Sequence, residues 1–246
     1  MSSRAHLSEP VLPLFTQAPT PVQPSYIKDH RKRLRDRFVS GGPDAVPDYE
    51  LLELVLFRAI PRRDVKPLAR ALLDAFGDFA HVVAAAPARL RDVDGVGDAV
   101  VLELKVVEAA AQRFARGKVI DRPVLSGWDA LLDYCQTRLA HLTVEQVRVL
   151  YLDRKNRLIA DEGQGQGTVD HVPLYPREVL KRGLELNASA LILVHNHPSG
   201  DPTPSEADIS LTHEIAQGAH ALGLSVHDHL VIGKSTHVSF RDEGLL

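Results

Sequence analysis

Apolar residues recur at helical spacing through the first half of the chain, whereas the second half adds short alternating or wholly apolar runs. Turn residues divide the first pattern into predicted helices at 48–60, 64–77, 79–86, 87–90 and 99–116, and Asp48 is expected to cap the first of them. After residue 126 the predicted strands lie at 144–153, 157–162, 168–172, 191–194, 224–232 and 236–240, with a loop at 163–167. The predicted helices of this half lie at 128–140, 176–185 and 206–222. An all-α region followed by an α+β or α/β domain is therefore expected.

The same patterns predict where the domains begin and end. Residues 1–24 contain five prolines and little periodic apolar pattern, which predicts a disordered tail. A helical domain at 25–116 starts with a basic helix at 26–38, which is either a solvated face or an arm that contacts phosphates. A change of composition predicts a linker at 117–126, and 127–246 forms the second domain.

Two glycines stand between a short helix and the long helix of the first domain. In LRDVDGVGDA, residues 90–99, Gly95 and Gly97 permit positive φ and expose backbone amides at a helix N-terminus. The layout resembles the helix-hairpin-helix family, which holds DNA phosphates without reading the base sequence. This makes Gly95 and Gly97 candidate contacts to a DNA backbone. Asp94 and Asp98 oppose phosphate binding, and the alternative is a tight turn used for packing or for contact with a partner.

The stretch with the strongest chemistry is 191–208, LILVHNHPSGDPTPSEAD. A buried strand ends in His195 and His197, and residues at i and i+2 of an extended segment point to one side. Asp208, in the first turn of the following helix, can fold back towards them. Two imidazole nitrogens and one carboxylate oxygen are the ligands of an open, catalytic zinc site, in which water takes the fourth position.

A catalytic zinc also needs a base for the water and a donor for the oxyanion. Glu145, at the start of a predicted strand, is the candidate base. Ser205 is the candidate oxyanion donor, and with Asp208 it also forms a capping-box pattern at the start of a helix. His227 and His229 alternate along a strand, where they either orient a ligand or occupy the core or the surface.

These residues carry a resemblance to a known family. His195-x-His197-Pro198-Ser199, then Ser205-x-x-Asp208, with an upstream Glu, resembles the JAMM (MPN+) metalloprotease motif. With YPREV at 175–179 and DHLVIG at 228–233, the chain from residue 26 onwards resembles the bacterial RadC family (UPF0758-type).

The resemblance implies a mixed β-sheet flanked by helices and hydrolysis of a peptide or isopeptide bond. It implies one zinc held by His195, His197 and Asp208, with Ser205 steadying the oxyanion. The glutamate that activates water carries over to Glu145, and Glu162 is its rival.

The composition restricts the cellular compartment and the partners that are expected. The single cysteine, Cys135, excludes an intramolecular disulfide and a cysteine-based zinc site, which fits a reducing cytoplasm. We find no apolar run of the roughly 20 residues that a bilayer requires and no signal-peptide pattern, so a cytoplasmic protein without a membrane partner is expected. The net charge of −3 argues against a protein that coats nucleic acid, although a local basic patch is compatible with it.

The predicted function is therefore that of a zinc-dependent metallopeptidase-like hydrolase with a peptide or protein substrate. The first alternative is a DNA-associated accessory or repair protein that uses the helix-hairpin-helix and has a structural or vestigial metal site. The second is a metal-dependent nuclease or phosphoesterase. Such enzymes gather more carboxylates around two metals, and this stretch offers only Asp208, with Asp201 nearby. The sequence does not predict the oligomeric state.

Overall fold

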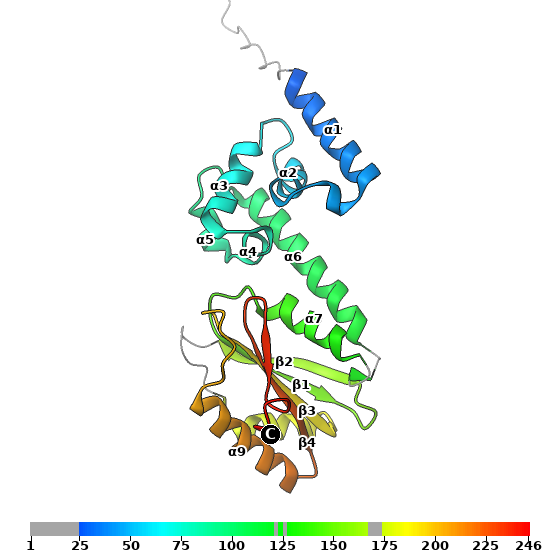
Figure 1. Ribbon diagram of the computed structural model, residues 1–246, viewed down its shortest axis with the longest axis vertical. Helices are drawn as coiled ribbons and strands as arrows, with labels where there is room; N and C mark the ends of the chain where they lie inside the picture. The colour runs from blue at the N-terminus through cyan, green and yellow to red at the C-terminus, as the bar shows by residue number, and fades with distance from the viewer. Residues whose placement is uncertain (1–24, 121–122, 125–126, 167–173) are drawn as a thin grey trace, which may run out of the picture.

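The computed structural model describes residues 25–120, 123–124, 127–166 and 174–246 (Figure 1). The predicted tail at 1–24 and the predicted strand at 168–172 lie outside these residues. A helical region is followed by a five-stranded mixed sheet with helices, which confirms the predicted fold class. None of the helices in the described ranges combines the length and the apolar character that crossing a membrane requires.

The helical region encloses one apolar core. Its elements are α1 (Ser25–Gly41), η1 (Pro43–Ala45), α2 (Asp48–Ala59), α3 (Lys66–Phe76), α4 (Phe79–Ala84), α5 (Pro87–Arg91) and α6 (Asp98–Val119). Leu56, Leu72 and Leu104 lie on three different helices and are fully buried in this core. Asp48, expected to cap α2, instead accepts a hydrogen bond from the backbone N–H of Phe79 at 3.3 Å, because Pro47 holds the N-cap position.

One residue of the basic helix α1 is structural. Arg31 is only 7% exposed, and its guanidinium lies 4.4 Å from the centre of the Phe57 ring. It donates hydrogen bonds to the carbonyl oxygens of Ile60 at 2.6 Å and Arg63 at 2.5 Å, just beyond the last turn of α2. The last carbonyl groups of a helix have no hydrogen-bond donor within the helix. The Arg31 guanidinium is the donor at this end of α2. Lys32 and Arg33 are exposed, which is compatible with a solvated face and with an arm that contacts phosphates.

Arg31→Ala is therefore expected to destabilise the chain by about 2–3 kcal/mol, because hydrogen bonds from a charged donor and a stacking contact are lost. Urea unfolding followed by circular dichroism measures the difference. Arg33→Ala, an exposed change two residues away on the same helix, is the control and should stay within about 0.5 kcal/mol of the wild type. Equal stability of the two variants would contradict the structural role.

The two glycines before α6 have different conformations. Gly95 has φ of 90°, whereas Gly97 has φ of −104° and ψ of 179°, an extended conformation open to any residue. The expectation of left-handed backbone thus applies to Gly95. Arg91 pairs with Asp98 at 3.0 Å across the turn, so one of the two flanking carboxylates has a guanidinium beside it. Contact with DNA through this turn stays a prediction.

The sheet places β3 at its centre. Its strands are β1 (Gln146–Leu152), β2 (Leu158–Gln166), β3 (Ala190–Asn196), β4 (Ser225–Ile232) and β5 (His237–Ser239), in the order β2-β1-β3-β4-β5. β3 is antiparallel to β1 and parallel to β4. β2 continues through residues 163–166, where a loop was expected, because Arg148 and Gln146 of β1 pair with Gly163 and Gln166. Pairing with β1 outweighs the low strand propensity of glycine at 163.

Helices cover both faces of the sheet (Figure 1). α7 (Trp128–Leu139) packs on one face, and α8 (Pro176–Glu185) and α9 (Glu206–Ala221) pack on the other. All seven residues of β3 are buried as a result. The C-terminal end of α6 joins the first face through Ala115 and Val119, so the first three residues of the predicted linker are helical.

Candidate metal centre

The C-terminal end of β3 meets the first turn of α9 at a cluster of three metal-ligating side chains. His195 lies in β3 and is 1% exposed, and His197 follows the strand, with its backbone N–H donating to Ile232 of β4 at 3.0 Å. The Nε2 atoms of the two histidines are 3.0 Å apart. Nε2 of His195 lies 3.6 Å from Oδ1 of Asp208, and Nε2 of His197 lies 3.8 Å from Oδ2. The three predicted ligands therefore converge on one point.

The donor set and its spacing fit zinc. With zinc–ligand distances of 2.0–2.2 Å, tetrahedral ligands are about 3.3 Å apart. The three observed separations of 3.0, 3.6 and 3.8 Å bracket this value. Two imidazoles and one carboxylate are also the donor set of catalytic zinc sites that keep one open position.

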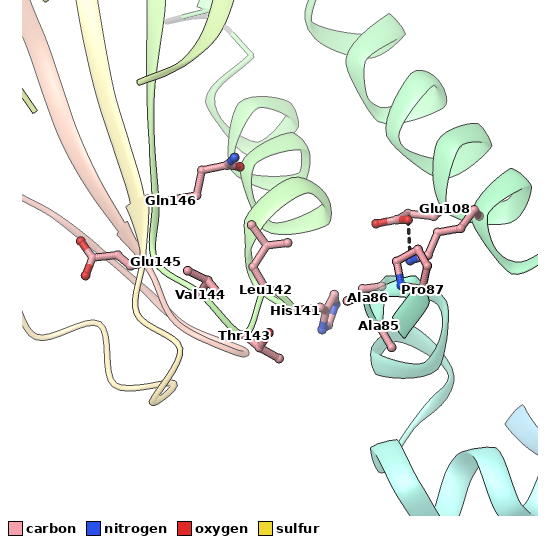
Figure 2. Close-up of a pocket in the computed structure, with 12 residues that line it drawn as sticks. Ala85, Ala86, Pro87, Glu108, His141, Leu142, Thr143, Val144, Glu145 and Gln146 are labelled. Carbon is pink, nitrogen blue, oxygen red and sulfur yellow. Dashed lines mark hydrogen bonds and ion pairs between the residues drawn. The ribbon is translucent and has the colours of Figure 1, made fainter. Parts of the chain in front are cut away.

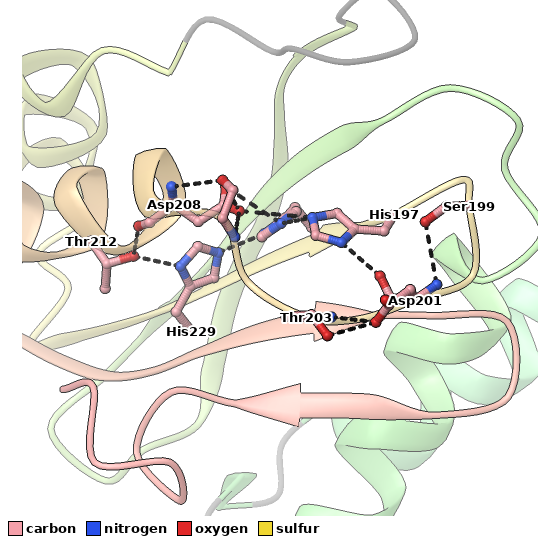
Figure 3. Close-up of polar contacts among 9 residues, drawn as sticks. His197, Ser199, Asp201, Thr203, Asp208, Thr212 and His229 are labelled. Carbon is pink, nitrogen blue, oxygen red and sulfur yellow. Dashed lines mark hydrogen bonds and ion pairs between the residues drawn. The ribbon is translucent and has the colours of Figure 1, made fainter.

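Hydrogen bonds that run from His195 through His229 to Thr212 determine which nitrogen of His195 carries a proton. Figure 3 shows Thr212 between Asp208 and His229. The hydroxyl of Thr212 donates to the carbonyl oxygen of Asp208 at 2.6 Å, so its oxygen accepts from Nδ1 of His229, also at 2.6 Å. Burial lowers the pKa of His229 well below its ordinary value, so the ring is neutral and its Nε2 accepts. That Nε2 lies 2.8 Å from Nδ1 of His195, which must then donate. The lone pair on Nε2 of His195 is left pointing at the site.

A hydrogen bond to a backbone carbonyl also places the proton of His197 on Nδ1. Its Nδ1 lies 2.8 Å from the carbonyl oxygen of Asp201, which can only accept, so Nδ1 carries the proton (Figure 3). In the neutral ring, Nε2 of His197 therefore presents a lone pair to Nε2 of His195. Two lone pairs that face each other at 3.0 Å repel, and a cation between them removes the repulsion.

The charges of the three side chains also favour binding of a cation. Burial lowers the pKa of His195 to about 4, which keeps this ring neutral at physiological pH. The carboxylate of Asp208 raises the pKa of His197, against the effect of burial, so positive charge is favoured there. Burial tends to raise the pKa of Asp208, but the two histidines and hydrogen bonds from Ser205 outweigh it and hold the pKa below its usual range. His195 thus offers a neutral nitrogen and Asp208 an anionic oxygen, whereas His197 releases a proton on binding zinc wherever its ring is charged.

Ser205 and Asp208 form the capping box that the sequence predicted. Oδ2 of Asp208 accepts from the backbone N–H of Ser205 at 2.8 Å and from its hydroxyl at 2.6 Å. The backbone N–H of Asp208 in turn donates to the Ser205 oxygen at 3.2 Å. This box fixes the carboxylate at the start of α9, and it occupies the Ser205 hydroxyl that the oxyanion role would use.

Thr212 was not singled out from the sequence, although it lies one helical turn after Asp208 and so faces the same side. Thr212→Val is expected to lower zinc affinity by about 10- to 100-fold, the usual effect of removing an outer-shell partner. Without the hydroxyl, His229 can take the other tautomer and drive a proton onto Nε2 of His195. Competition with a zinc chelator dye measures the change. Thr137→Val, an exposed threonine of α7, is the control and should bind zinc as the wild type does.

The candidate base Glu145 is placed by a side chain of β3. Asn196 is 1% exposed, and its amide accepts from the backbone N–H of Gln146 at 2.9 Å and donates to the carbonyl of Val144 at 3.2 Å. These bonds hold the backbone on both sides of Glu145 beside the end of β3. The negative charge of Glu145 contributes to the raised pKa of His197, so the carboxylate acts on the metal ligands. No local pattern assigns this part to Asn196, because its partners lie about 50 residues away.

Glu162, the other candidate base, is bound to an arginine of α8. Glu162, on β2, accepts hydrogen bonds from the Arg182 guanidinium of α8 at 2.7–3.1 Å, and this partner lowers its pKa. His227 bonds Oδ1 of Asn156 at 2.7 Å and does not reach the ligands, in contrast to His229. Of the two alternating histidines, only the second therefore supports the cluster.

A cleft of about 360 Å³ lies next to the Glu145 segment (Figure 2). Its walls are the connection at 84–87, the side of α6 that carries Lys105 and Glu108, and residues 141–146. In Figure 2 the Glu145 carboxylate points away from α6 and towards the sheet. The cleft and the metal ligands therefore lie on the two sides of one short segment.

The fold and the cluster together define a JAB/MPN-type domain. Residues 125–245 match the family described as the RadC-like JAB domain. The chain is 72% identical to a UPF0758 protein of Rhodobacter capsulatus over 213 residues. The aligned region spans 87% of this chain and the full length of that protein. The chain is 68% identical over 223 residues to a UPF0758 protein of Ruegeria pomeroyi, covering 91% of this chain and all of that protein. The chain belongs to the RadC (UPF0758) family.

Proposed function

We propose that this protein is a zinc-dependent hydrolase that cleaves a peptide or isopeptide bond. The observation that carries the proposal is the convergence of His195, His197 and Asp208, with outer hydrogen bonds that turn both imidazole lone pairs to the same point. A site used only to tie two segments together would be expected to close all four positions with protein ligands. Three ligands leave one position for water and substrate.

The chain's own residues can complete the reaction. A zinc held by His195, His197 and Asp208 would lower the pKa of a water and polarise a carbonyl oxygen. Glu145 accepts a proton from the attacking water and passes it to the nitrogen of the leaving amine, while the water oxygen bonds to the carbonyl carbon and the carbon–nitrogen bond breaks. Ser205 donates to the oxyanion if its hydroxyl turns away from Asp208.

The cleft beside Glu145 supports a substrate larger than a single amide. Its lining contains Ala84, Ala85, Ala86 and Pro87 together with Val144, a wall with small and apolar side chains. Such a wall suits a peptide segment that runs along the outer side of the Glu145 segment, opposite the metal ligands. We therefore assign a peptide or protein substrate.

Metal content tests the proposal most directly. Plasma mass spectrometry of the purified protein should give about one zinc per chain. Protein without metal that also takes up none when zinc is added would contradict the proposal and would favour a DNA-associated accessory module.

A further inference from the structure

The long helix α6 has an apolar side that the rest of the described chain leaves open. Its buried side carries Val101, Leu104 and Ala115, which pack in the two cores. On the other side Leu102 is 62% exposed, Val106 51% and Phe114 72%. Large exposed apolar residues that recur along one helix face mark an interaction surface.

The centre of this open face has the spacing of a coiled-coil seam. Six positions recur at intervals of 4, 3, 4, 3 and 4 residues, and we call them the α6 seam: Ala99, Glu103, Val106, Ala110, Arg113 and Gly117. Five of the six are exposed, and Glu103 is half-buried. This spacing keeps one stripe turned towards a partner helix. Small residues at three positions let a partner helix approach closely, because the interaxial distance depends on the side chains in contact.

We propose that the α6 seam binds the same seam of a second copy of this chain, in antiparallel orientation, around a twofold axis at the middle of the helix. In this arrangement Ala99 faces Gly117 of the second copy, and Val106 faces Ala110. Glu103 faces Arg113, and the twofold repeats each contact. An interface of this kind is self-complementary, as closed dimers require.

Charge selects a second copy in this orientation. Antiparallel pairing joins the carboxylate of Glu103 to the guanidinium of Arg113 twice, whereas parallel pairing would set Glu103 against Glu103 and Arg113 against Arg113. Within the chain, Arg58 holds Glu103 by an ion pair of 3.0 Å while remaining 75% exposed itself.

The helix ends agree with the same orientation. Asp98 lies in the first turn of α6, and Arg116 and Lys118 lie in the last. Antiparallel helices bring acidic and basic ends together and also align their dipoles favourably.

The position of α6 determines how the two copies would be arranged in the dimer. α6 carries the helical region at one end and reaches the sheet domain at the other (Figure 1). Antiparallel pairing therefore places the helical region of each copy beside the sheet domain of the other.

Charge reversal tests the register. Size-exclusion chromatography with light scattering, at tens of micromolar protein, should give twice the 27.0 kDa of one chain. Glu103→Arg and Arg113→Glu alone should each weaken the dimer at least tenfold, and the double variant should restore it. Glu214→Arg, an exposed charge reversal on α9 away from the seam, should leave the mass unchanged. A monomeric wild type, or single variants that dimerise as well as the wild type, would overturn the proposal.

Cysteine cross-linking tests the same register without altering charge. Positions 99 and 117 lie about 27 Å apart on one helix, beyond the reach of a disulfide. Both are exposed, a side chain at Gly117 meets nothing within 4 Å, and the native Cys135 is buried. An oxidised mixture of Ala99→Cys and Gly117→Cys should give a disulfide between the two variants, and neither variant alone should give one. Disulfides in a single variant, or none in the mixture, would overturn the antiparallel pairing.

Discussion

His197→Ala should reduce bound zinc from about one atom per chain to a small fraction of that. The change removes one of three ligands and also the group whose Nε2 lies 3.0 Å from Nε2 of His195. It should also abolish the stabilisation by added zinc. At a free zinc concentration 100 times the Kd, binding stabilises the native wild type by about 2.7 kcal/mol, which raises Tm by about 5–10 °C in a chain of this size.

Plasma mass spectrometry and thermal unfolding with and without zinc measure these two effects. His220→Ala is the matched control, because His220 is an exposed histidine near the other end of α9. It should keep both the metal and the thermal shift. Full zinc content in the His197 variant would mean that the metal is held elsewhere.

Glu145→Gln should lower the rate of hydrolysis by about 10²- to 10⁴-fold, the usual contribution of a positioned base, while zinc content stays at about one per chain. The amide of glutamine keeps the size of the side chain and the hydrogen bonds between Asn196 and the neighbouring backbone, but it cannot accept the proton. A peptide mixture analysed by mass spectrometry for new termini can supply the substrate and the rate.

Glu162→Gln separates the two candidate bases. Its carboxylate is bound to Arg182, so the loss of that ion pair should change stability slightly and turnover by no more than a few-fold. Full activity of the Glu145 variant, or loss of activity with Glu162→Gln alone, would reverse the assignment.

The fold class could be predicted because, within the described residues, the periods of apolar residues matched the helices and strands that formed. Two errors in local structure arose from contacts distant in sequence. Residues 163–166 join β2 because β1 offers them partners, and Asp48 turns from its own helix to the backbone of Phe79. Neither partner is visible in a local pattern.

The metal cluster could also be predicted from sequence, because all three ligands lie within 14 residues on a strand, a loop and a helix start. Their supporting residues could not. His229 and Asn196 act through contacts over 34 and about 50 residues, which depend on the pairing of β3 with β4 and β1. Thr212 could have been found, since its spacing from Asp208 is that of one helical turn.

The burial of β3 on both faces has a consequence for how metal enters and leaves. His195 belongs to a strand that is paired on both edges, so its backbone amides should exchange with deuterium only when the whole sheet domain opens. The ligands are then held in place by the fold before any ion arrives. Metal loss should leave the fold intact, in contrast to small zinc-nucleated domains, and chelated protein should recover its metal without refolding.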